Sequence, residues 1–181
     1  RLHWLSSKMQ RENKFIADPE RLSQLLNRFE QSLMHCNNSA ELMAQEAVMT
    51  KALYKLAATT VKYGDFIRAK QGGSSDLANR FLDHGNYLAY GLAAVACWVI
   101  GLPHGLAVLH GKTRRGGLVF DVADLIKDAL ILPQAFISAM NGEDEQEFRQ
   151  RCISNLQNAD ALDTMIDALQ STAQLLSGVG K

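Results

Sequence analysis

The sequence predicts an all-α protein whose 181 residues form a single domain of six to eight helices. In several long segments apolar side chains recur at intervals of three and four residues, which is the period of a helix with one buried face. No stretch of four or more residues alternates strictly between apolar and polar side chains, as a half-buried strand would. Residues typical of helix starts and ends flank these segments, so each predicted helix can be placed in order.

The first two helices are predicted from their N-caps. Asp18 precedes Pro19, a favoured residue at the first helical position, and an apolar stripe follows. Asn38, with Glu41 three residues later, resembles a capping box and starts a longer helix, roughly residues 39–63.

The middle of the chain predicts a helix over roughly residues 77–100, which contains the longest apolar run, residues 87–100. This run is shorter than the about 18–20 residues that cross a bilayer. We therefore expect a helix that is buried on all sides, and no membrane span. A glycine-rich loop, residues 102–117, leads into a helix from Leu118 onward.

Three further helical segments complete the prediction. Pro133 is expected to open a helix that continues through Met140, because proline is tolerated in a first turn. The acidic run at residues 143–145 starts the next helix, where negative charge is favourable. The last helix spans about residues 159–176, and residues 177–181 are expected to fray.

The composition is typical of a soluble globular protein with no net charge. Hydrophobic residues make up 47% and charged residues 21%, and 19 basic residues balance 19 acidic ones. A nucleic-acid partner must therefore be argued from local basic clusters. Cys36, Cys97 and Cys152 include no CxxC pair, which disfavours a zinc knuckle or disulfide framework and fits a reducing cytoplasm.

The N-terminal segment shows no recognisable helical or targeting pattern. The first residue is Arg1, and no signal or transit peptide is recognisable. Residues 1–17 show no steady period and are expected to be a linker or a poorly ordered segment. We therefore expect a piece of a longer protein, with one domain over residues 1–181.

The strongest functional signal lies between His110 and Asp124. The histidine is followed by a basic loop, and the paired carboxylates Asp121 and Asp124 lie three residues apart, on one face of the predicted helix. An imidazole beside two carboxylates suits a divalent cation, and the cationic side chains of the loop suit a phosphodiester. The basic residues of this loop are Lys112, Arg114 and Arg115.

Each part of this signal also has an ordinary explanation. Asp-x-x-Asp is common on solvated helix faces, and a single histidine is more often a structural residue than a ligand. The apolar neighbours of Asp121 and Asp124 favour partial burial, where a carboxylate needs a cation, hydrogen bonds or a raised pKa. Glu46 borders the apolar stripe of its helix and is either one of many exposed glutamates or a ligand that reaches across to His110 and Asp124.

A set of one glutamate, one histidine and one or two aspartates is a hard anionic site. It suits Mg²⁺ or Mn²⁺ better than Zn²⁺, because no thiolate or second histidine is suitably spaced. Such a metal can polarise a phosphoryl oxygen and activate a water or a 3′ hydroxyl of DNA.

Four motifs together resemble a known family. They are Glu46 with Tyr54 in AQEAVMTKALY, Asn79 in DLANRFLDHGNYLAYGL, the histidine loop IGLPHGLAVLHG and the paired-aspartate segment LVFDVADLIKD. In this order they resemble the CRISPR-associated spacer-acquisition integrase, the "Cas-one" family, and its subtype I-F branch in particular. Ala47 and Lys127 depart from the pattern, since many members carry Gly and Arg there.

The resemblance implies the C-terminal helical catalytic domain of a homodimeric, metal-dependent DNA endonuclease and integrase. Such an enzyme inserts foreign DNA fragments into a CRISPR array by attack of a 3′ hydroxyl on a phosphodiester. Glu46, His110 and Asp124 would ligate Mn²⁺ or Mg²⁺, and Asp121 would support the site or hold a second ion. The implied partners are DNA, a second copy and the "Cas-two" protein, which subtype I-F fuses to the helicase-nuclease.

One difference from the family qualifies this implication. The family's N-terminal β-rich domain, which usually builds the dimer, is absent from the sequence, so the isolated chain is expected to be weakly active or inactive. From their charge and their position in loops, we expect four side chains to contact phosphates, namely Arg68, Lys112, Arg114 and Arg115. The alternative is a non-enzymatic helical module that binds DNA or protein, with its acidic groups solvated or in ion pairs, and the zero net charge favours it.

Overall fold

The structure is a computed structural model, which describes residues 18–69, 76–106, 108–110 and 115–178. These residues form seven helices and no strand, which confirms the all-α prediction. The predicted linker at residues 1–17 and the tail residues 179–181 lie outside the described residues. The helices are α2 (Pro19–Leu33), α3 (Ser39–Thr60), α4 (Leu77–Val99), α5 (Gly117–Ala123), α6 (Lys127–Asn141), α7 (Glu145–Asn158) and α8 (Ala161–Ser177).

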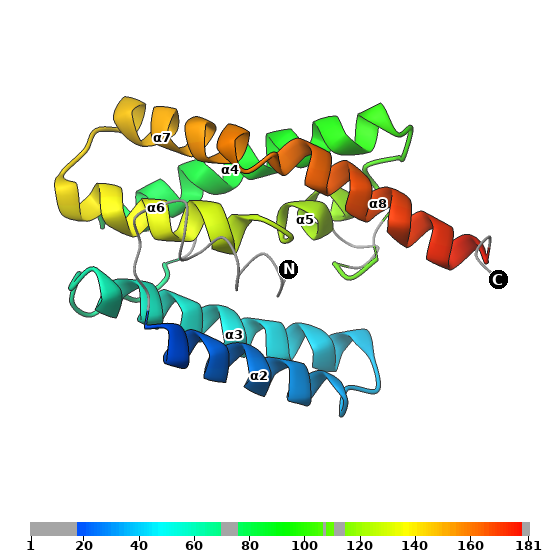
Figure 1. The fold of residues 1–181 in the computed structure, drawn as a ribbon, viewed down its shortest axis with the longest axis horizontal. Coiled ribbons are helices and arrows are strands. Elements are labelled where there is room, and N and C mark those ends of the chain that lie inside the picture. The colour runs from blue at the N-terminus through cyan, green and yellow to red at the C-terminus, as the bar shows by residue number, and fades with distance from the viewer. Residues whose placement is uncertain (1–17, 70–75, 107, 111–114, 179–181) are drawn as a thin grey trace.

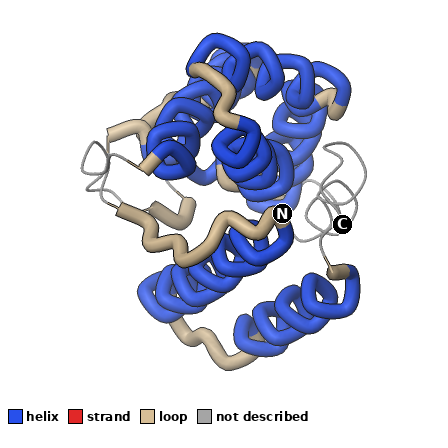
Figure 2. The backbone as a smooth tube through the Cα atoms, turned by 90° about the vertical axis from the view of Figure 1, so that its left-hand side faces the viewer, coloured by secondary structure: helices blue, strands red, loops and turns tan. Residues whose placement is uncertain are grey.

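The helices form two layers (Figure 1). Helices α2 and α3 form an antiparallel pair on one side, and Figure 2 shows the same pair as a separate layer from a second direction. In the other layer α4 contacts α5, α6, α7 and α8, so it is the central helix of the fold. The layers meet where α3 packs on α6. Glu46 on α3 and Asp124 at the end of α5 therefore come from opposite layers.

The predicted caps explain where several helices begin. The Asp18 side chain accepts hydrogen bonds from the backbone N–H groups of Glu20 and Arg21, and Asn38 caps α3 through the N–H of Glu41. Asp144 and Glu147 form a reciprocal capping box at the start of α7. These local contacts are readable from the sequence because they involve residues within one turn of each other.

The prediction for Pro133 was wrong. Helix α6 begins at Lys127, and Pro133 lies in its interior. The whole segment from Asp128 to Phe136 is buried, so packing on several neighbours stabilises a helix that proline alone would interrupt. The predicted end of α3 was also late, because the helix ends at Thr60 and Lys62 already has a positive φ of 59°.

The prediction that the apolar run of α4 is buried on all sides was also wrong. Its small residues, such as Ala89 and Ala93, are fully buried, whereas Tyr87, Val95 and Trp98 are exposed. Small side chains let α4 approach its neighbours closely, and at Gly85 an added Cβ would overlap Ile131 of α6. None of the helices in the described ranges has the length and apolarity needed to cross a membrane.

Candidate metal centre

Three segments that are distant in sequence converge at one point between the two layers. Glu46 comes from α3, His110 from the loop before α5, and Asp124 from the C-terminal end of α5. One potential ligand atom of each lies within 4.8 Å of those of the other two. Donors that bind one ion at about 2.0–2.5 Å lie within about 5 Å of each other. The three side chains are therefore close enough to share a cation.

The position of the two aspartates follows from how α5 begins and packs. The helix is short and starts directly after a glycine. Gly116 precedes the helix with a positive φ of 75°, a conformation in which glycine carries no steric penalty. Leu118, Val119 and Val122 are buried and fix the opposite side of the helix in the core. As the sequence predicts, Asp121 and Asp124 both face the loop that carries His110.

Asp121 holds His110 and its loop in place. The His110 Nδ1 lies 2.6 Å from Asp121 Oδ1, which also accepts a hydrogen bond of 3.2 Å from the His110 backbone N–H. The backbone N–H groups of Val108 and Leu109 donate to Asp121 Oδ2 at 2.8 and 3.1 Å. The Asp121 carboxylate therefore orients an imidazole ring, and its hydrogen bonds occupy both of its oxygens.

The electrostatics of Asp121 fix the tautomer of His110. Burial raises the pKa of the Asp121 carboxyl, but hydrogen bonds from the His110 ring and the Leu109 and Val108 amides outweigh it, so that the pKa lies below its ordinary value. An ionised carboxylate can only accept, so His110 Nδ1 carries the proton. In neutral His110 the lone pair of Nε2 then faces Asp124 Oδ2, which lies 3.7 Å away. Two acceptors that face each other favour a cation between them.

Lys127 is a neighbour of the site that the sequence reasoning did not place there. Its ammonium forms an ion pair with Asp124 Oδ1 from three residues along the chain. Burial lowers the pKa of Lys127, but the carboxylates of Asp124 and Asp128 outweigh this effect and raise it above its ordinary value. Lys127 is therefore a fixed positive charge on the far oxygen of Asp124, and its i,i+3 spacing was the signal that could have revealed it.

The donor set fits a small hard divalent cation. Two carboxylates and one imidazole nitrogen provide oxygen and nitrogen ligands, which Mn²⁺ accepts well and Mg²⁺ accepts through the carboxylates. The side chains of His110 and Asp124 are only 13% and 9% exposed, so the charged groups are largely shielded from water. The orienting hydrogen bond from His110 to a carboxylate is typical of metal-binding histidines.

Two of the four predicted phosphate contacts lie among the described residues, and their surroundings differ. Arg68 is part-buried, where its guanidinium forms an ion pair with Asp83 and donates to Asn79 Oδ1 at 2.9 Å. Arg115 is exposed just before α5. Lys112 and Arg114 lie outside the described residues. The contacts of all four residues with DNA stay a prediction.

Asn79, which the resemblance singled out, is a buried structural residue. Its side chain donates to the carbonyl of Ile67 at 3.0 Å and accepts from the backbone N–H of Ala69 at 3.0 Å. These bonds, together with the one from Arg68, attach the segment after α3 to the first turn of α4.

Comparison with known proteins agrees with the four motifs. Residues 2–171 match the family model described as CRISPR associated protein Cas1. The chain is 68% identical over 179 residues to the CRISPR-associated endonuclease Cas1 of Pectobacterium atrosepticum, covering 99% of this chain and 55% of that protein. It is 59% identical over 171 residues to the protein of the same name from Pseudomonas aeruginosa, covering 94% and 53%. The chain thus spans about half the length of these relatives.

Solved structures share the helical fold. A crystal structure of a TtCas1–DNA complex superimposes with a TM-score of 0.69 over 91% of this chain and 63% of that chain, at 22% identity. The crystal structure of TtCas1 itself gives a TM-score of 0.67 at 23% identity over 91% and 65%. The match over nearly the whole chain and the two close relatives show that this chain belongs to the CRISPR-associated Cas1 family.

Proposed function

We propose that the chain is the catalytic helical part of a metal-dependent DNA endonuclease and integrase that acts in CRISPR adaptation in the cytoplasm. The observation that carries this proposal is the convergence of Glu46, His110 and Asp124, whose ligand atoms lie within 4.8 Å of one another. The names of the two close relatives support an endonuclease, and the TtCas1–DNA complex supports DNA as the substrate class.

Each residue of the site has a distinct proposed role. Glu46 and Asp124 offer carboxylate oxygens and His110 offers Nε2 to Mn²⁺ or Mg²⁺. The bound cation supplies Lewis-acid polarisation of a phosphoryl oxygen. Asp121 keeps the His110 ring in one tautomer and orientation, and the hydrogen bonds on both of its oxygens favour this supporting role over a second ion. Lys127 holds Asp124 by its other oxygen.

The proposed reaction is attack of a DNA 3′ hydroxyl on a phosphodiester of the CRISPR array. The new bond to phosphorus forms as the bond to the neighbouring 3′ oxygen breaks, that oxygen leaves as a 3′ hydroxyl, and the number of phosphodiester bonds is unchanged. Arg68, Lys112, Arg114 and Arg115 are the proposed contacts to the sugar-phosphate backbone. In the full-length protein we further propose a homodimer that works with the "Cas-two" partner fused to the helicase-nuclease.

Calorimetry with Mn²⁺ tests the metal site directly. The wild-type protein is expected to release or absorb heat on binding Mn²⁺, and Glu46→Gln is expected to lose this signal because it lacks one carboxylate ligand. Glu30→Gln is the matched control, since Glu30 is an exposed residue of α2. The same heat for wild type and Glu46→Gln, or no heat at millimolar Mn²⁺, would contradict the assignment.

A second candidate function is a non-enzymatic helical module that binds DNA or protein. The ion pair between Lys127 and Asp124 favours it, because a protein cation already balances part of the negative charge at the site. The same titration separates the two functions, since a module of this kind has no Mn²⁺ signal that depends on Glu46.

A further inference from the structure

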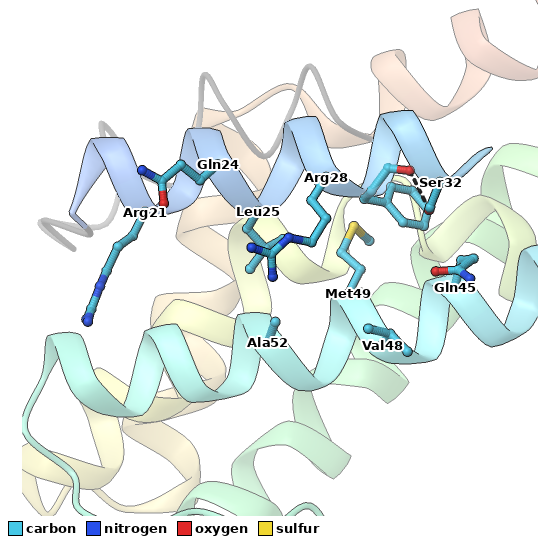
Figure 3. Close-up of a pocket in the computed structure, with 10 residues that line it drawn as sticks. Arg21, Gln24, Leu25, Arg28, Ser32, Gln45, Val48, Met49 and Ala52 are labelled. Atoms are coloured by element: carbon cyan, nitrogen blue, oxygen red, sulfur yellow. Dashed lines mark hydrogen bonds between the residues drawn. The ribbon is translucent and has the colours of Figure 1, made fainter. Parts of the chain in front are cut away.

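A groove lies between α2 and α3 and is lined by residues of both helices. Its volume is about 210 Å³, and Figure 3 shows both arginines extending from α2 toward α3, Arg28 above Ala52 and Arg21 nearer the start of α2. Leu25 and Val48 give it a partly apolar floor. Both arginines are exposed, so their side chains are accessible from solvent.

The two guanidinium groups have no counter-charge within the part of the chain that the structure describes. Neither forms an ion pair or a side-chain hydrogen bond with a described residue, in contrast to Arg68, Arg80 and Arg151, which each pair with a carboxylate. None of the described residues that line the groove is acidic. A planar guanidinium offers several donors in the geometry that phosphate oxygens accept.

The groove continues along α3 through two further depressions. The second is lined by Arg21 and Lys55, again with no acidic residue among its described lining residues. The third has a volume of about 590 Å³ and is lined by Lys51, Lys55 and Arg68, and Asp65 is its single acidic residue among those described. We call this continuous surface the α3 track and define its cations as Arg21, Arg28, Lys51, Lys55 and Arg68.

The dimensions of the α3 track suit an extended polyanion. Its lining residues on α3 run from Gln45 to Thr59, which at about 1.5 Å per residue spans roughly 21 Å. Each strand of duplex DNA carries one phosphate about every 3.4 Å along the helix axis, so a duplex segment of this length carries roughly six phosphates on each strand. Gln45, at one end of the track, directly precedes Glu46 of the candidate metal centre.

We propose that the α3 track binds the sugar-phosphate backbone of duplex DNA, with Arg21 and Arg28 among its contacts. This proposal rests on the proposed function and specifies one surface that it uses. The chain has zero net charge, yet two arginines of α2, two lysines of α3 and Arg68 of the following segment line these depressions with a single acidic lining residue among those described. They form a local basic cluster, in which, within the described residues, Arg68 alone is already paired with a carboxylate. A cluster of this kind is what backbone contacts with DNA require.

The salt dependence of DNA binding tests the proposal. A labelled duplex of random sequence is titrated into the full-length protein at several salt concentrations. Arg21→Gln/Arg28→Gln is expected to bind about 100-fold more weakly at roughly 0.1 M salt. Each lost phosphate contact reduces the magnitude of the slope of log K against log salt by about one unit, which is about tenfold in affinity at this salt concentration relative to about 1 M. Glutamine is a good helix former, so α2 is expected to stay folded.

Matched variants separate charge from shape. Arg28→Gln is expected to reduce the magnitude of the slope by about one unit, whereas Arg149→Gln, on the exposed side of α7, is expected to leave it unchanged. Arg28→Lys is expected to keep the wild-type slope, since the charge is retained. Circular dichroism on each variant checks the fold.

The outcomes distinguish this proposal from the proposed function. If the wild-type protein binds the duplex and the double variant has the same slope, the α3 track does not contact DNA while the proposed function stands. An acidic segment of a partner protein then becomes the occupant to seek. If the wild-type protein does not bind the duplex at all, both proposals fail.

Discussion

The candidate metal centre and the α3 track share one helix but differ in how their charged groups are held. In the metal centre, Asp121 accepts four hydrogen bonds and Asp124 forms an ion pair with Lys127. In the track, Arg21 and Arg28 pair with no described residue and extend from an exposed helix face. The first region is preorganised for one geometry, and the second can adapt to a variable ligand.

This difference explains why the two regions suit different tasks. Chemistry at a metal depends on ligand positions that are fixed before the substrate arrives, which requires buried hydrogen bonds. Holding a DNA backbone depends mainly on charge, and long exposed side chains supply it without a fixed geometry. Substitutions should therefore have large and specific effects in the metal centre, and moderate, salt-dependent effects in the track.

The largest effect is expected for Asp124→Ala. In the full-length protein, cleavage and integration of DNA should fall by more than about 100-fold, because loss of a ligand exceeds the 10- to 100-fold effect of losing an outer hydrogen-bond partner. Asp163→Ala, an exposed acid in the first turn of α8, is the control and should keep full activity. Wild-type rates for Asp124→Ala at saturating Mn²⁺ would show that the site is not catalytic.

Leu53→Ala is expected to weaken both regions together through the helix that they share. Leu53 is fully buried on α3, so the substitution should lower the free energy of unfolding by about 2–5 kcal/mol. Val48→Ala on the same helix removes a side chain that is 62% exposed and should change it by less than about 0.5 kcal/mol. Denaturation with urea measures both values, and equal effects would mean that α3 is not anchored through Leu53.

Asp121→Ala is expected to loosen the metal centre without removing a ligand. The affinity for Mn²⁺ should fall by about 10- to 100-fold, because the His110 ring loses the partner that fixes its tautomer. Calorimetry measures the affinity and the number of ions bound. A loss of one bound ion at unchanged affinity would instead assign Asp121 to a second ion.

The smallest effect on stability is expected in the track. Arg21→Gln/Arg28→Gln should change the free energy of unfolding by less than about 0.5 kcal/mol, because both side chains are exposed and pair with no described residue. Urea denaturation checks this value. A loss above about 1 kcal/mol would show that the arginine side chains pack on the floor of the groove instead of extending to a ligand.

Two of the three helix predictions that the structure corrects have a common cause in packing. Pro133 looked like a helix start because local sequence cannot show that neighbouring helices bury the whole segment from Asp128 to Phe136. The apolar run of α4 was predicted to be buried because hydropathy alone does not show which sides of a helix its neighbouring helices cover. In the structure the small residues are covered and Trp98 is 77% exposed.

The candidate site was predictable in its residue types but not in its contacts. The sequence placed Asp121 and Asp124 on one side of a short helix, since residues three apart share a face. Their spacing alone could not assign different tasks to them, and the family resemblance left Asp121 either as a support of the site or as a holder of a second ion. Asp121 meets the His110 ring and three backbone N–H groups, and this is a property of how the loop before α5 folds back on it.

By itself the sequence determined the helical class, most of the helix starts and the family motifs, because caps and apolar periods act within a few residues of each other. Only the tertiary structure decided that Glu46 meets His110 and Asp124, that Lys127 holds Asp124, and that the cations of α2 and α3 line one surface. These contacts join segments that are distant in the chain, and they form only when the two layers pack. Burial of apolar side chains in the whole core drives that packing, and no single motif encodes it.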